Sequence, residues 1–266
     1  MVFNNNLLMG GVAASSGGGG GYSVTKSCMF NEVDSCYMHR TPGGAGNRKT
    51  WTVSTWYKRG RIETAGDYDY KWFLFADNTG GYGDGLRWRN YQLESSFTPS
   101  GADGSAGRLQ TTQTFLDCGA WYHLVQSVDT TQAMSLNRVK VYVNGIQMSN
   151  FGTETYPALN YASGVNSTDP QQVGGSPNRP GQYQDGYMAE TIMIDGLQLP
   201  PSSFGEYTST GIWRPIDPSG LTFGTNGFYF KYEDSSALGT DSSGNGNTFT
   251  TSGLTTANQS IDTPSS

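Results

Sequence analysis

The sequence predicts an all-β fold, a sandwich or jelly roll built from many short strands. Glycine is abundant, with 37 of the 266 residues, and each glycine would cost about 1 kcal/mol inside a helix. Aromatic residues make up 13% of the chain, so Trp, Tyr and Phe can supply much of a core. Alternating or continuous apolar segments are separated by turn clusters throughout, a pattern typical of strands.

The strand segments follow one another along the chain. Trp51–Lys58 alternates and is rich in β-branched and aromatic residues, and Lys71–Phe75 is a short apolar run typical of a buried strand. Further strands are predicted at Trp121–Val128, Tyr187–Ile194 and Gly227–Tyr232.

A hairpin is predicted after Arg138–Val143, where the valines face one way and the residues between them face the other. Asn144 and Gly145 follow, and both tolerate the positive φ of a two-residue turn. Ile146 then begins the return strand.

Turn clusters at Asp77–Gly85, Pro99–Gly107 and Pro177–Gly181 separate the strands. Helix is nearly absent, with one turn expected within Pro200–Glu206. We find no internal repeat and no boundary between domains, so residues 22–266 are predicted to form a single domain.

Residues 1–21 form a separate N-terminal arm. Its apolar tip is followed by a spacer of small residues, Gly10–Gly21, that ends in glycines; the tip residues are Phe3, Leu7, Leu8 and Met9. Alone in water such an arm buries too little surface to order itself. We therefore expect an assembly arm that docks on a neighbouring chain, with a flexible tail as the alternative.

Charge and hydropathy exclude several partners. The net charge is −6 and charged residues make up 14%, without the basic patch that nucleic acid requires. No apolar run approaches the roughly 20 residues of a membrane span. Residues 1–9 lack the positive region of a secretory signal, so release by cell lysis is expected.

The cysteines and histidines indicate neither a disulfide framework nor a catalytic site. Cys28, Cys36 and Cys118 are odd in number, and reduced, half-buried thiols are expected. His123 lies within a predicted strand and is expected to be packed and hydrogen-bonded, while His39 has no nucleophile motif beside it. A Cys/His metal site has little support.

The order of four segments carries a resemblance to a known family. Trp51–Trp56, Trp121–Val125, Val139–Gly145 and Gly186–Glu190 follow one another as the characteristic strands of laminin-G-like, concanavalin-A-like domains do. The chain resembles this family over most of residues 45–195, which implies a jelly-roll β-sandwich.

A narrower resemblance covers nearly the whole chain. Its markers are Phe3–Gly10, Asn47–Trp51, Gly227–Phe230, Leu238–Asn247 and Asp262–Pro264. With these the chain is similar to laminin-G-like structural proteins carried by phages of marine and freshwater bacteria. The resemblance implies a virion protein, assembled in the bacterial host cytoplasm and exposed on the particle. Its partners would be other capsid or tail proteins and copies of itself, for example in a trimer.

Jelly rolls of this kind also include glycosidases, which need a pair of carboxylates. Glu190 and Asp195 are the nearest candidates, but their odd spacing sends the two side chains to opposite faces of a strand unless a bulge intervenes. Glu190 is expected to be a polar residue at a strand end, with Asp195 in the following turn. We therefore expect no enzymatic activity.

Aromatic residues in or beside Gly- and Asn-rich segments are candidates for glycan binding, because sugars stack on aromatic faces. They are Tyr82, Trp88, Tyr91, Tyr156, Tyr161 and Tyr183. The alternative is that these rings plug loops or line a subunit contact.

A segment rich in oxygen ligands follows near the C-terminus. A structural calcium ion could be held there, and the candidate ligands are Asp234, Asp241, Asn245 and Asn247. The same residues also build tight turns without metal, which we favour, so no cofactor is expected.

The predicted function is a non-enzymatic phage structural protein, a capsid decoration or a short head or tail appendage. It would display a lectin-like domain that attaches to host-surface glycans. The alternatives are a tail-fibre or receptor-binding lectin module and, third, a glycan-cleaving enzyme.

Overall fold

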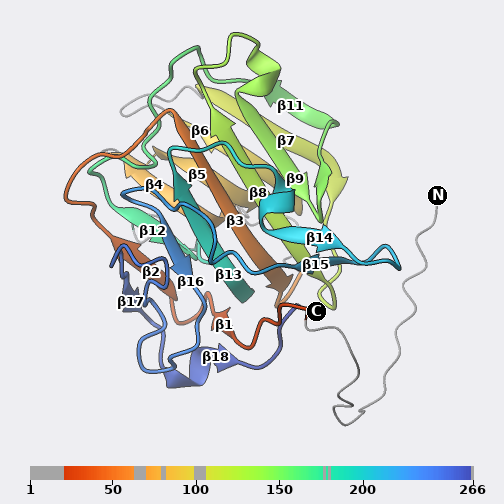
Figure 1. Ribbon diagram of the computed structural model, residues 1–266, viewed down its shortest axis with the longest axis vertical. Helices are drawn as coiled ribbons and strands as arrows, with labels where there is room; N and C mark the ends of the chain where they lie inside the picture. The colour runs from red at the N-terminus through yellow and green to blue at the C-terminus, as the bar shows by residue number, and fades with distance from the viewer. Residues whose placement is uncertain are drawn as a thin grey trace.

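The computed structural model describes residues 21–62, 70–78, 82–98, 106–175, 178 and 181–264. Within these ranges the chain forms two large antiparallel sheets packed face to face, and a small third sheet (Figure 1). The all-β sandwich is therefore confirmed. The helices of the described ranges are single 3₁₀ turns: η1 (Ser135–Asn137), η2 (Pro201–Ser203) and η3 (Thr256–Asn258).

Sheet A runs in the order β10 (Ile146–Gln147), β9 (Val139–Val143), β8 (Trp121–Asp129), β3 (Thr50–Arg59), β13 (Gly186–Asp195), β1 (Ser27–Phe30) and β18 (Gln259–Ser260), with β16 (Phe228–Phe230) also paired to β13. Sheet B runs in the order β11 (Phe151–Thr155), β7 (Gly107–Thr114), β6 (Gln92–Phe97), β5 (Tyr82–Arg89), β4 (Tyr70–Asn78), β12 (Gln171–Val173), β2 (Tyr37–Arg40) and β17 (Thr250–Ser252). The small sheet pairs β14 (Gly205–Tyr207) with β15 (Trp213–Pro215). Most neighbours in space are therefore distant in sequence.

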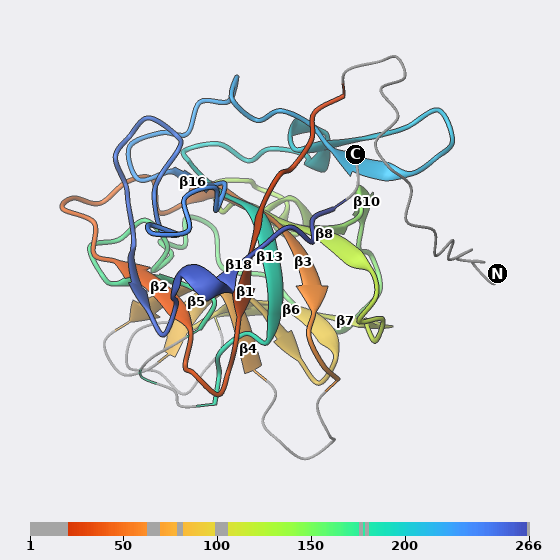
Figure 2. The same ribbon diagram turned by 90° about the horizontal axis from the view of Figure 1, so that it is seen from below.

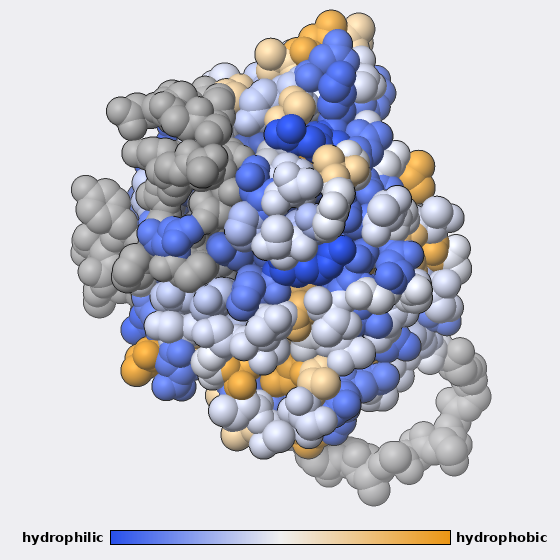
Figure 3. All heavy atoms as spheres, turned by 90° about the vertical axis from the view of Figure 1, so that its left-hand side faces the viewer, coloured by the Kyte–Doolittle hydropathy of each residue, from blue (hydrophilic) through white to orange (hydrophobic). Residues whose placement is uncertain are grey.

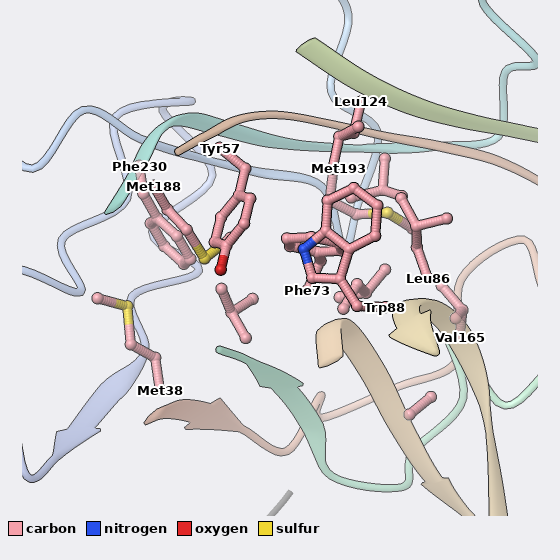
Figure 4. Packing of buried hydrophobic residues seen from close by; sticks show 14 of the residues in the cluster. Met38, Tyr57, Phe73, Leu86, Trp88, Leu124, Val165, Met188, Met193 and Phe230 are labelled. Carbon is pink, nitrogen blue, oxygen red and sulfur yellow. The ribbon is translucent and has the colours of Figure 1, made fainter. Parts of the chain in front are cut away.

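The main core fills the space between the two large sheets (Figure 4). On β3, Trp51, Val53 and Tyr57 alternate with residues of the other face and are buried. The Tyr57 ring meets Phe73 edge-on with ring centroids 4.8 Å apart, and Phe73 meets Trp88 at 5.3 Å. Edge-to-face contacts between large rings are thus part of how the aromatic residues of the sequence fill the core.

The outer face of sheet A is covered as well. Figure 2 shows sheet A between sheet B and the chain that follows β13. A second buried apolar cluster lies in this outer layer and comprises Val125, Ile192, Ile194, Phe204, Phe223 and Tyr229. Burial on both faces explains why β13 is almost continuously buried instead of alternating.

The surface carries few large apolar side chains, because most of them are buried in the core. The face drawn in Figure 3 is mainly hydrophilic or intermediate, and its apolar residues form small scattered groups. Among the residues placed by the structure, no helix has the length and apolarity that crossing a membrane requires.

The turn predicted at Asp77–Gly85 is wrong at both ends. β4 continues to Asn78, and β5 already begins at Tyr82. Asp84 is fully buried in β5, where its carboxylate accepts backbone N–H groups of Thr98 and Gly164, each at 2.7 Å. Residues that resemble a turn thus form a strand, because distant loops supply hydrogen-bond donors for the aspartate. The Pro99–Gly107 and Pro177–Gly181 clusters lie largely outside the described residues.

The cysteines are free thiols, as expected, but they are not uniformly half-buried. Cys28 and Cys36 are completely buried, and Cys118 is partly exposed. Burial raises the pKa of the Cys28 and Cys36 thiols, so both remain protonated at neutral pH.

The hairpin after β9 is confirmed. The valines of β9 are buried and the intervening Lys140 and Tyr142 are partly exposed. Asn144 and Gly145 have φ values of 49° and 80°, and Ile146 pairs with Val143 in the return strand.

Replacing Gly145 by Val should destabilise the fold. The backbone strain at positive φ is about 1–3 kcal/mol, and a Cβ at this position would lie 2.6 Å from the Trp213 ring. Gly211, with φ of 82° and open space around it, provides the matched control. Thermal denaturation should show a larger loss for Gly145→Val than for Gly211→Val, and an unchanged midpoint for Gly145→Val would contradict the assignment.

A candidate ligand-binding groove at the strand ends of sheet A

A groove of about 480 Å³ lies where the C-terminal ends of β1 and β3 meet the N-terminal end of β13. These strand ends lie together in the lower part of the molecule in Figure 1. The side chains that give the groove its chemistry are Asn31, Lys58, Arg59, Asp185, Tyr187 and Asp262.

Two glycines allow the strands to approach one another at this end. A Cβ on Gly186 would lie 2.3 Å from the Lys58 carbonyl oxygen, and one on Gly60 would lie 2.7 Å from an Asp185 carboxylate oxygen. The Gly60 N–H donates to the Asp185 carbonyl at 2.9 Å. A side chain at Gly186 would therefore collide with the backbone of β3 at this junction.

Asp262 lies on one side of the groove and ties the C-terminal segment to sheet A. Its carboxylate accepts from Lys58 Nζ at 2.7 Å and from Trp121 Nε1 at 3.1 Å, one donor on each oxygen. Its backbone carbonyl accepts from the Ser27 hydroxyl at 2.6 Å. The carboxylate is therefore held in one orientation.

Asp185 also lines the groove. Arg61 Nε contacts its carboxylate at 3.1 Å, and the Tyr57 hydroxyl donates to its carbonyl at 2.9 Å. Burial raises the pKa of Asp185, and the charge of Arg61 partly offsets this rise. Glu32, close by, pairs with both Arg61 and Lys71.

Arg59, another residue that lines the groove, is only 2% exposed. Its guanidinium carbon lies 4.4 Å from the centroid of the Trp88 ring. The Nε and Nη2 atoms are buried without a hydrogen-bond partner. By contrast, Arg87 and Arg89 both pair with the buried Glu94.

Glu190 occupies a different place, on the outer face of sheet A. The pairing of β13 with β3 shifts register between Ala189 and Ile192, and Glu190 has a positive φ of 48°. Its carboxylate accepts from the hydroxyls of Tyr22, at 2.9 Å, and Tyr229. Burial raises the pKa of Glu190 from 4.5 to about 7.

The bulge that could have paired Glu190 with Asp195 thus exists, yet the structure does not bring the two together. Asp195 accepts from the backbone of Asn47 and Asn226 and from the Asn166 amide, and shares no partner with Glu190. Five residues of strand correspond to roughly 16 Å at about 3.3 Å per residue. This separation leaves no acid pair on β13.

His123 is packed and hydrogen-bonded, as expected. Its ring stacks on Trp56 with centroids 4.8 Å apart. Trp213 Nε1 can only donate, so His123 Nδ1 accepts this bond at 3.0 Å and Nε2–H donates to Ser54 Oγ at 2.8 Å. Complete burial lowers the pKa of His123 from 6.5 to about 3, so the ring is neutral.

The aromatic residues selected from the sequence do not form one binding surface. Trp88 is fully buried in β5, because its position alternates with the strand's outward-facing arginines. Tyr183 is also buried, and the Tyr161 hydroxyl donates to Asp84 at 3.2 Å. Of these three rings, Trp88 belongs to the main core and Tyr161 is partly buried against it.

The remaining candidates, Tyr91 and Tyr156, are partly buried, and the Tyr156 hydroxyl donates to Glu154 at 3.0 Å. The Tyr82 side chain lies outside the described residues. The described rings of the selected set do not line the groove. Tyr187 does, but its position inside a clear strand pattern gave no signal of binding.

The proposed calcium ligands are engaged in turn hydrogen bonds. The Asp241 carboxylate accepts backbone N–H groups of Tyr229, Ser243 and Asn247 at 2.7–2.9 Å. The Asn245 and Asn247 amides donate to backbone carbonyls, and Asp234 accepts from Ser236. Within the described ranges no three His, Cys, Asp or Glu side chains form a metal cluster. Calcium binding stays a prediction.

A two-sheet antiparallel jelly roll with a polar groove at its strand ends defines a lectin-like domain. The chain belongs to the concanavalin A-like lectin/glucanases superfamily, through a laminin-G family that matches residues 37–196, more than half of the chain. The resemblance to laminin-G-like domains is therefore confirmed.

The chain is also similar, at low sequence identity, to several solved structures. A heptameric SAP-like pentraxin from Limulus polyphemus has a TM-score of 0.46 and 12% identity, covering 66% of this chain and 78% of its own. Domains LG4-5 of the mouse laminin alpha1 chain have a TM-score of 0.45 and 12% identity, and the match covers 81% of this chain and 49% of the laminin chain. A third structure is domain 4 of AbnA, an arabinanase from Geobacillus stearothermophilus, in complex with arabinotriose. It has a TM-score of 0.32 and 20% identity, and the match covers 59% of this chain and 65% of the AbnA domain. None of the curated proteins matches the sequence.

The raised pKa of Glu190 predicts a pH-dependent stability. The folded state holds the proton more tightly than the unfolded chain, so this contribution is fully present below about pH 4.5 and is lost as pH rises through about 7. The expected loss is on the order of 3 kcal/mol. Urea unfolding between these pH values should show the slope in the wild type and a flatter profile in Glu190→Gln. Glu206→Gln, at an exposed ion pair, should keep the wild-type slope; an equal slope in both variants would disprove the assignment.

Proposed function

We propose that this chain is a non-enzymatic glycan-binding module displayed on a phage particle, and that the groove at the strand ends is its binding site. The observation that carries the proposal is one partly exposed aromatic ring, Tyr187, set among fixed polar groups in the groove. Membership of the lectin/glucanase superfamily supports the same class of ligand.

The groove has the two elements that sugar recognition needs. The Tyr187 ring offers an apolar face on which a pyranose can stack. The carboxylates of Asp185 and Asp262 and the amide of Asn31 offer hydrogen-bond partners for hydroxyl groups. Both carboxylates are already held by cations, so little freedom is lost when a ligand binds.

Binding without cleavage follows from how these carboxylates are engaged. A glycosidase needs one carboxyl to act as an acid and another as a nucleophile or base. Both oxygens of Asp262 already accept hydrogen bonds, from Lys58 and Trp121. Asp185 is paired with Arg61. We expect purified protein to release no reducing sugar from the glycans that it binds.

Replacing Tyr187 by Ala should weaken glycan binding about tenfold, because a stacking surface is lost. Ligands found on a glycan array should be compared by calorimetry with the wild type and the variant. Tyr91→Ala and Tyr156→Ala serve as controls, since neither residue lines the groove. Binding that depends on Tyr91 or Tyr156 and not on Tyr187 would place the site on the loops instead.

The phage role is supported by the resemblance to phage structural proteins. The arm itself, including Phe3, Leu7, Leu8 and Met9, lies outside the described residues. Its point of departure is described: the Tyr22 hydroxyl binds Glu190 on the outer face of sheet A, and Gly21 lies against Arg214. These contacts place the start of the domain, next to the arm, at the outer layer of sheet A.

Deletion of residues 1–21 should leave the domain folded but exclude it from virions. An apolar tip of this size needs an apolar groove on a partner, because leaving its side chains in water forfeits several kcal/mol. The matched control replaces Phe3, Leu7, Leu8 and Met9 by Ser and keeps the spacer. Both variants should show wild-type thermal stability and fail to join particles; full occupancy by either one would assign the contact to the jelly roll.

A further inference from the structure

Residues 22–26 form a strap on the outer face of sheet A, between the N-terminal arm and β1. Val24 is buried in a cluster with Trp56, and the Thr25 hydroxyl donates to Glu233 at 3.2 Å. No backbone–backbone hydrogen bond joins this strap to the rest of the described chain. The strap is therefore held by its side chains, and a segment held in this way opens at a low cost in free energy.

Three oxygen atoms meet where the strap begins. Tyr22 Oη lies 2.7 Å from Tyr229 Oη and 2.9 Å from Glu190 Oε2, and Tyr229 donates to the same carboxylate oxygen. Each of the three oxygens is thus within hydrogen-bond distance of the other two. Glu190 is only 5% exposed and Tyr229 only 1%, so these contacts are shielded from water.

Three hydrogen bonds among three oxygens need three protons. The two tyrosine hydroxyls supply two, and a protonated carboxyl group supplies the third. An ionised Glu190 can only accept, so both hydroxyl protons point at it and the contact between the two tyrosine oxygens is left without a proton. The same change buries a negative charge. The closed strap therefore matches the protonated form of Glu190.

The charges around the cluster favour the same form. Burial raises the pKa of Glu190 to about 7, and the charge of Lys231 offsets only part of this rise. Lys231 Nζ lies 5.4 Å from the centroid of the Tyr229 ring. The ionisable groups that act on Glu190 or Tyr22 from the chain packed against them are Asp217, Tyr229, Lys231, Tyr232 and Glu233. Lys231 is the one cation among them.

We propose that Glu190 and Tyr22 form a pH-dependent latch, which keeps the strap closed while Glu190 is protonated and releases it when Glu190 ionises. Release lengthens the arm by residues 22–26 and uncovers Trp56, which is 4% exposed beside the closed strap. The closed form holds the proton more tightly than the open form, so closure is fully favoured below about pH 4.5 and is lost as pH rises through about 7. This inference concerns the arm and does not depend on glycan binding.

The test places a nitroxide spin label on the strap of the full chain. The exposed Ser23 is replaced by Cys, and the partly exposed Cys118 by Ser; Cys28 and Cys36 are completely buried and stay unlabelled. Electron paramagnetic resonance then reports the mobility of the label between about pH 5 and about pH 9. The ratio of mobile to immobilised label should rise at least about tenfold, the factor for one unit of pKa difference, with a midpoint near pH 7.

Two variants test the two halves of the latch. Glu190→Gln keeps a neutral side chain that can donate, so its label should stay immobilised over the whole range. Tyr22→Phe keeps the ring and removes the hydroxyl, so its label should be mobile even at about pH 5. If Glu190→Gln fails to fold, Tyr22→Phe, whose side chain is only partly buried, decides the question.

Two controls separate the latch from other effects of pH. A label at the exposed Ser209, between β14 and β15, should show the same mobility at every pH. Glu233→Gln changes the other carboxylate that the strap contacts, and it should keep the transition with a midpoint no higher than that of the wild type, because Glu233 raises the pKa of Glu190.

The outcomes that would overturn the latch are distinct. The strap label could stay immobilised at every pH, or its transition could persist in Glu190→Gln or Tyr22→Phe. A transition that disappears in Glu233→Gln would assign the pH response to the Thr25 contact instead. Loss of the β-sheet signal in circular dichroism over the same range would mean that the whole domain unfolds and that no local latch exists.

Discussion

Strand β3 is buried on both faces, and this constraint organises the rest of the structure. Its inward residues, among them Trp51 and Tyr57, pack against sheet B. Its outward residues Thr52 and Ser54 would face water in a one-sided sheet, but here they are buried and need partners. Thr52 donates to the Leu197 carbonyl, and Ser54 bonds to His123. The outer layer therefore both supplies hydrogen-bond partners for buried polar groups of sheet A and buries its apolar side chains.

The groove lies at the end of β3, where the strand is no longer covered on both faces. At the last residues of β3 the outer layer gives way to the C-terminal segment, and Lys58 on the outward side finds Asp262. On the inward side, Arg59 takes the place that an apolar residue would fill, without a partner of its own. Two adjacent residues of β3 thus belong to different layers, because their side chains point to opposite faces of one strand.

Buried carboxylates play different roles in this fold, depending on which hydrogen-bond donors surround them. Glu190 lies at a bulge under two tyrosine hydroxyls, and its pKa rises because burial outweighs those hydrogen bonds. Asp84 and Asp241 instead serve as acceptors for backbone N–H groups that secure loops. A carboxylate in this fold is structural where several donors converge on it.

Local alternation in the sequence was enough to predict the all-β fold, the strands at 51–58 and 121–128, and the hairpin at Asn144, because side-chain period and turn chemistry are properties of neighbouring residues. It was not enough for Trp88, whose ring is buried against Tyr57 of the other sheet, nor for Asp84, whose donors come from distant loops. The groove was hidden for the same reason: Lys58 and Asp262 are 204 positions apart and meet only through sheet pairing. Whether a polar residue faces water, a partner or a ligand depends on which distant segment packs against it, and only the tertiary structure decides that.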